Sequence, residues 1–72
     1  VLIHTLYSTR EEGYSDNIDE WERRAREWNP VQINKNSNYT GYKNLPSDAK
    51  SYVVVAYFAN GERVISSVYH KE

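Results

Sequence analysis

The two histidines of the chain, His4 and His70, stand near its two ends. If the segments that contain them pair as strands, the imidazoles become neighbours and offer two nitrogen ligands. A metal site in a protein takes further ligands, and no Asp or Cys lies at ligand spacing from either histidine. We therefore predict that these residues do not form a metal centre, and that the chain holds no cofactor.

Arg63, Tyr69 and His70 are residue types with which small ribonucleases act from the face of a sheet. Such enzymes are usually basic, whereas this chain has nine basic and ten acidic residues and a formal net charge of −1. The three glycines form no phosphate-binding motif, and Ser66-Ser67 lacks the glycines of a nucleophile elbow. These observations favour a protein that is not an enzyme.

The segment 34–44, NKNSNYTGYKN, combines Lys35 and Lys43 with Tyr39 and Tyr42. Aromatic rings that stack on bases, beside lysines that meet phosphates, are what binding of single-stranded nucleic acid requires. However, residues 10–27 carry a net charge of −3, which would repel phosphates. Single-stranded nucleic-acid binding through this loop is therefore the alternative hypothesis.

Protein binding is the class that the composition favours. Seven tyrosines and two tryptophans in 72 residues are a high load of the aromatic residues that, with arginine, dominate protein interfaces. We predict a small inhibitor, adaptor or regulator that docks on a larger protein, alone or as a homodimer. The candidate partner-binding residues are Tyr39, Tyr42, Tyr52, Tyr57, Arg63 and Tyr69.

Three elements must position these side chains. Residues 1–7, VLIHTLY, are β-branched and apolar and predict a strand. Asn17, with Glu20 three residues later, resembles a capping box, and it opens a predicted helix over 18–28 that Asn29-Pro30 would end. Ile18, Trp21, Ala25 and Trp28 form one apolar stripe along that helix.

The third element is a hairpin over residues 52–70, because Asn60-Gly61 separates two β-branched runs. A type I′ turn at this pair would place Ala59 opposite Glu62 and Val53 opposite Val68. Both faces of this ribbon are rich in apolar side chains, and the helix can cover only one. The other face must be covered by residues 31–45, by a second copy of the chain, or by another protein.

Together these elements predict one α+β domain over residues 1–72. Its small antiparallel sheet would combine the N-terminal strand with the C-terminal hairpin and pack on one amphipathic helix. No apolar run approaches the length of a membrane span and no signal-peptide pattern is visible, so we expect a cytoplasmic location. The size and near-neutral charge are common among accessory proteins of phages and mobile elements.

Overall fold

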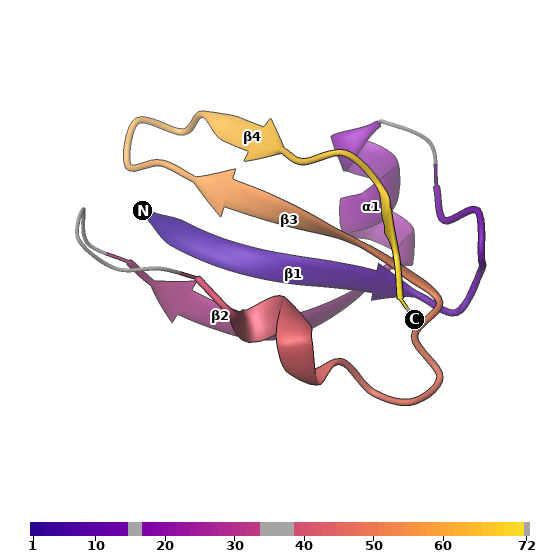
Figure 1. Ribbon diagram of the computed structural model, residues 1–72. Coiled ribbons are helices and arrows are strands. Elements are labelled where there is room, and N and C mark those ends of the chain that lie inside the picture. Colours follow the sequence, from indigo (N-terminus) through magenta and orange to yellow (C-terminus); the bar gives the residue numbers. More distant parts are fainter. Residues whose placement is uncertain (15–16, 34–38, 72) are drawn as a thin grey trace.

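A computed structural model of the chain describes residues 1–14, 17–33 and 39–71 (Figure 1). Lys35, one of the two lysines in the predicted nucleic-acid loop, lies outside these residues. No helix within the described ranges is long and apolar enough to cross a membrane. The elements, in chain order, are β1 (Leu2–Ser8), α1 (Ile18–Arg24), β2 (Arg26–Gln32), the 3-10 helix η1 (Gly41–Asn44), β3 (Ser51–Tyr57), β4 (Arg63–Ile65) and β5 (Tyr69–His70).

The strands form one antiparallel sheet in the order β2-β1-β3-β4, with β5 also paired to β3 (Figure 1). β1 pairs with β3 along its whole length, from Leu2 opposite Tyr57 to Ser8 opposite Ser51. The predicted α+β fold, a small sheet packed on one amphipathic helix, is therefore wrong. The protein is mainly an antiparallel sheet, and its one α-helix in the described residues spans only seven residues.

The helix starts as predicted and ends four residues early. The side chain of Asn17 accepts a hydrogen bond from the Asp19 N–H at 2.9 Å, which confirms the cap. Ala25 already has an extended backbone, and Arg26 begins β2 opposite Tyr7 of β1. A helix this short is marginally stable by itself, so backbone pairing with β1 outweighs the local helical pattern.

Pro30 lies inside β2 because the pairing with β1 shifts there. The register passes from Ile3 opposite Val31 to Thr5 opposite Trp28, which leaves one extra residue in β2. β2 is an edge strand, and an edge bulge is where a sheet tolerates a proline that has no N–H to donate. The proline that was expected to end a helix therefore marks a strand bulge.

The hairpin forms at Asn60-Gly61, but its predicted register is wrong. The Phe58 N–H donates to the Glu62 carbonyl, and the Gly61 N–H donates to the Phe58 carbonyl, each at 3.0 Å. These bonds and the positive φ of Gly61, 92°, describe a three-residue loop rather than a type I′ turn. Tyr57 consequently pairs with Arg63, one residue away from the predicted register.

This shift exchanges two side chains between the faces of β4. Ile65 packs on the helix side of the sheet, whereas Val64 is 55% exposed. One extra residue between β4 and β5 then restores the predicted register, and Tyr52 pairs with Tyr69.

The core has two parts, one on each face of the sheet. On the helix side, Leu6, Val53 and Val55 pack with Trp21, which is 0% exposed. On the opposite side the buried residues are Tyr7, Leu45 and Ala49, with Trp28 and Tyr52 packed against them. Residues 39–50 thus cover part of the second face.

The predicted helix stripe is wrong at Trp28. This residue lies in β2 and packs on the face away from the helix, with its ring 6.2 Å from that of Tyr7 in an edge-on contact.

The Cα radius of gyration is 11.6 Å, close to the value of about 11 Å expected for a compact chain of this length.

Candidate functional site

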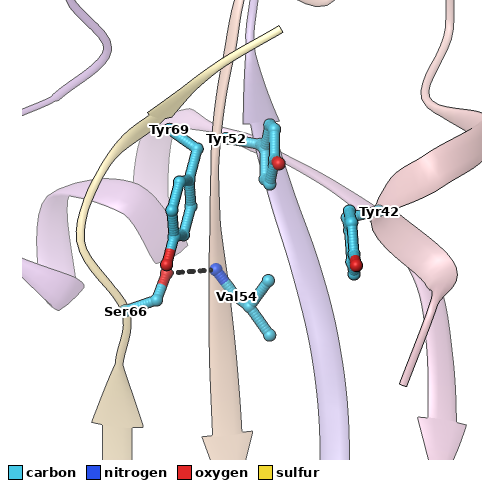
Figure 2. Close-up of a pocket in the computed structure, with 5 residues that line it drawn as sticks. All are labelled: Tyr42, Tyr52, Val54, Ser66 and Tyr69. Atoms are coloured by element: carbon cyan, nitrogen blue, oxygen red, sulfur yellow. Dashed lines mark hydrogen bonds between the residues drawn. The ribbon is translucent and has the colours of Figure 1, made fainter. Parts of the chain in front are cut away.

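Four tyrosine rings form a continuous row on the sheet face opposite α1, and we call Tyr39, Tyr42, Tyr52 and Tyr69 the tyrosine row. The ring centroids of Tyr42 and Tyr52 are 6.0 Å apart with planes at 10°, and those of Tyr52 and Tyr69 are 5.4 Å apart at 26°. Tyr39 continues the row at 6.3 Å from Tyr42 with a tilt of 46°. Figure 2 shows Tyr52 between its two stacked neighbours.

Three separate elements place these rings side by side. Tyr52 and Tyr69 are direct partners in the β3–β5 ladder, so their side chains leave the sheet on the same face. Tyr42 comes from η1, which crosses this face (Figure 1). The Tyr39 hydroxyl lies 2.5 Å from the Thr5 hydroxyl of β1, and this hydrogen bond holds the end of the row against the sheet.

Two shallow cavities adjoin the row. The first, of about 380 Å³, is lined by Tyr42, Tyr52 and Tyr69 together with Val54 and Ser66 (Figure 2). Ser66 lies between β4 and β5. Its place in the lining of this cavity is fixed because its hydroxyl accepts a hydrogen bond from the Val54 N–H at 2.9 Å.

The second cavity, of about 450 Å³, shares Tyr42 and Tyr52 and adds three basic side chains, Lys43, His70 and Lys71. Neither lysine forms an ion pair within the described part of the chain. The tyrosine row is therefore flanked on one side by cations that are available to a ligand.

The central ring of the row is held in its neutral form. Burial raises the pKa of the Tyr52 hydroxyl, and the neighbouring Tyr42 and Tyr69 raise it further. Tyr52 therefore keeps its proton and remains a hydrogen-bond donor across the physiological pH range. The row offers a ligand apolar ring surface together with the protonated hydroxyl of Tyr52.

Two of the six predicted partner-binding residues lie elsewhere. The Tyr57 hydroxyl donates to Glu22 Oε2 at 2.6 Å, and Arg63 Nη1 donates to Asp19 Oδ1 at 3.1 Å and to a Glu22 carboxylate oxygen. Burial and the Glu22 carboxylate raise the pKa of Tyr57. Tyr57 and Arg63 therefore connect β3 and β4 to α1 on the helix side, away from the tyrosine row.

The histidines considered as metal ligands, and the Arg63 and His70 considered for a ribonuclease-like site, do not converge. His4 pairs with Val55 and His70 with Ser51, so the two histidines lie at different positions along β3. Arg63 is bound by the acids of α1 and does not line the cavity that contains His70. Among the residues that the structure describes, no group of three or more His, Cys, Asp or Glu side chains could hold a metal ion.

Sequence reasoning missed three residues of this surface, namely Val54, Ser66 and Lys71. The predicted register placed Val54 on the correct face. The extra residue between β4 and β5, where Ser66 accepts from the Val54 N–H, had no signal in the sequence.

Comparison with known proteins adds no further assignment: no protein-family model, curated protein or solved structure matches this chain.

Proposed function

We propose that this protein is a non-catalytic protein-binding module, an adaptor or inhibitor that contacts its partner through the tyrosine row. The observation that carries the proposal is the set of stacked rings from η1, β3 and β5, with Tyr69 still 48% exposed. Tyrosine gives large contact area with few rotatable bonds, so ordering it at an interface loses little entropy.

The chemistry around the row indicates an acidic partner surface. Lys43, His70 and Lys71 line the cavity beside Tyr42 and Tyr52, and the two lysines have no ion-pair partner within the described residues. Complementary charge steers association and suppresses wrong partners. The proposed partner therefore presents Asp or Glu side chains next to apolar groups.

Single-stranded nucleic acid is the second candidate, because rings beside free lysines are also the components of a single-strand site. The ring geometry favours protein. Tyr52 has a stacked tyrosine on each side, so a base would have to separate these rings in order to stack on it (Figure 2). A protein segment can instead lie along the ring edges and fill the grooves between them.

Selection from a random peptide display library on the immobilised protein tests the proposal. We expect enriched peptides in which Asp or Glu flanks apolar residues. Synthetic copies of these peptides should bind the Tyr69→Ala variant about tenfold or more weakly than they bind the parent protein. Phe58→Ala is the matched control, since it removes an aromatic ring that is 39% exposed and follows directly after β3, at the end of that strand away from Tyr52.

Failure to enrich any peptide, or equal binding by Tyr69→Ala, would contradict the proposal. Salt-dependent binding of a labelled oligothymidylate that Tyr69→Ala abolishes would support the nucleic-acid candidate in its place. Sedimentation of the protein alone shows whether the surface is instead covered by a second copy of the chain.

A further inference from the structure

A third cavity, of about 240 Å³, lies at the end of β1 and shares no lining residue with the two cavities of the tyrosine row. Its lining residues are Tyr7, Ser8, Thr9, Tyr14, Arg24 and Arg26. They include two guanidinium groups and four hydroxyl groups, and among the described residues the lining contains no carboxylate. This composition attracts anions.

Arg26 reaches this cavity because the helix ends early. A helix continued to Trp28 would have set Glu22 and Arg26 four residues apart on one face, as an ion pair. In the structure Glu22 binds Arg63 and Tyr57 instead, and Arg26 lies in β2 directly opposite Tyr7. Arg26 forms no ion pair with any residue that the structure describes.

Arg24 is held in place at the other side of the cavity. Its guanidinium lies 5.0 Å from the centroid of the Tyr14 ring, and its Nη1 is 3.5 Å from Glu20 Oε2. These contacts orient the guanidinium before any ligand arrives, which lowers the entropy lost on binding. Glu20 is shared with Arg23, so it neutralises Arg24 only in part.

The neutral donors complete the site. Tyr7 and Ser8 are 6% and 3% exposed, so they form its floor. The Ser8 hydroxyl accepts a hydrogen bond from the Arg10 N–H at 2.9 Å, which leaves its own proton free to donate. The exposed Thr9 hydroxyl follows directly along the chain.

We propose that this cavity is a phosphate-binding site that takes a phosphate monoester. Such a group carries close to two negative charges and three terminal oxygens that accept hydrogen bonds. Arginine binds it through two parallel N–H donors. A carboxylate has one charge and two oxygens, and it would use fewer of the donors present.

The volume of the cavity indicates that it takes one phosphate group rather than a whole drug-sized ligand. At about 240 Å³ the cavity is smaller than the roughly 300–1,000 Å³ of sites that enclose drug-sized molecules. The phosphate therefore belongs to a free small phosphate or to a phosphorylated side chain whose remainder stays outside. The site does not depend on the function proposed for the tyrosine row.

Amide NMR titrations with phenyl phosphate at constant ionic strength test this proposal. We expect saturable shifts at Ser8, Thr9 and Arg26 with millimolar affinity. Arg26→Gln should weaken binding about tenfold or more. Lys43→Gln is the matched control: it removes one positive charge from an exposed side chain that lies outside this cavity and forms no ion pair among the described residues.

Comparing inorganic phosphate with a phosphoserine peptide and a phosphotyrosine peptide identifies the source, because a phosphorylated side chain should bind more tightly if the partner is a protein. Affinity should fall as the pH drops below about 6, where the dianion takes up a proton. Absence of saturable shifts, equal binding by Arg26→Gln, or equal weakening by Lys43→Gln would overturn the proposal. So would equal shifts with acetate or with a 5′-hydroxyl oligonucleotide, which lacks a phosphate monoester.

Discussion

At the scale of single residues, Gly13 and Gly61 have similar backbones and different surroundings. Both have positive φ, 62° and 92°. A Cβ at Gly13 would lie 2.7 Å from Trp21 Cζ2 and 3.0 Å from Ser51 Oγ, whereas a Cβ at Gly61 would meet nothing within 4 Å. The two positions therefore separate backbone strain from packing.

We predict that Gly61→Ala destabilises the protein by about 1–2 kcal/mol, because an L-residue is strained in the left-handed region. Gly13→Ala should cost roughly 1–3 kcal/mol more, because the added methyl overpacks the ring of Trp21. Urea denaturation of the two variants measures the difference. Equal destabilisation would show that the turn at Gly13 moves away from Trp21 freely.

The two tryptophans make a second residue-scale pair. Trp21 is 0% exposed and is the largest fully buried side chain of the helix-side core. Trp28 is half-buried, and its buried Nε1 has no hydrogen-bond partner among the described residues. An unpaired buried donor is unfavourable by itself, so removing it offsets part of the lost packing.

Trp21→Phe should therefore lower the free energy of unfolding by about 2 kcal/mol or more, and Trp28→Phe by less than about 1 kcal/mol. Denaturation followed by far-UV circular dichroism tests both variants, since it does not depend on the fluorophore that each variant loses. A larger loss for Trp28→Phe would contradict this account of the two cores.

At the scale of elements, the break between β4 and β5 depends on one hydroxyl. Ser66 Oγ accepts from the Val54 N–H and donates to the Ser67 carbonyl, each at 2.9 Å. A serine side chain thus supplies the acceptor that a continuous strand would have supplied through its backbone. The bond also fixes Ser66 in the lining of the cavity beside the tyrosine row.

Ser66→Ala should destabilise the protein by about 1 kcal/mol, because the Val54 N–H loses its acceptor. The exchange of the Val54 amide with solvent should speed up about fivefold, the factor that corresponds to this energy. Ser67→Ala is the control, because the Ser66 hydroxyl contacts Ser67 through its backbone carbonyl, which the substitution keeps. Unchanged exchange at Val54 in Ser66→Ala would contradict the role of the hydroxyl.

The elements also show which structural features neighbouring residues predict and which they do not. The first strand, the Asn17 cap and the turn at Asn60-Gly61 each depend on neighbouring residues, and all three were predicted. The end of the helix and the strand β2 depend on pairing with β1, which lies about 20 residues away in the chain. No window of sequence contains that interaction, so Trp28 and Arg26 were assigned to the wrong element.

At the scale of the whole molecule, the net charge of −1 conceals an uneven distribution. Asp19 and Glu22 of α1 are bound by Arg63, and Glu20 by Arg23 and Arg24. Lys43 and Lys71 lie by the tyrosine row. Counting charges along the chain predicted repulsion of anions by residues 10–27, but the cavity that these residues help to line carries two arginines.

The tyrosine row was predictable only in part for the same reason. Tyr39, Tyr42, Tyr52 and Tyr69 were singled out by residue type. Their stacking needs the β3–β5 register and the placement of η1 on the sheet, which are properties of the whole fold. Tyr57 belongs to the same residue type, yet it serves the contact between the sheet and the helix.

We predict that this contact makes the stability of the whole protein sensitive to alkaline pH. Burial and then the Glu22 carboxylate raise the pKa of Tyr57 above its ordinary value of 10.0, so the folded state favours the protonated hydroxyl. The resulting stabilisation is fully present below pH 10, where the unfolded chain is also protonated. It is lost as the pH rises above 10, because the unfolded chain then gains stability by releasing the proton.

Tyr57→Phe should be less stable than the parent protein by about 1 kcal/mol at neutral pH, because the hydrogen bond to Glu22 is lost. Above pH 10 the two urea denaturation curves should converge, since the variant has no Tyr57 proton to release and the parent protein loses the advantage of its bond. The other tyrosines are present in both proteins, so their effect cancels in the difference between the two at each pH. If the difference between the two proteins stays constant across this range, Tyr57 does not carry the alkaline sensitivity.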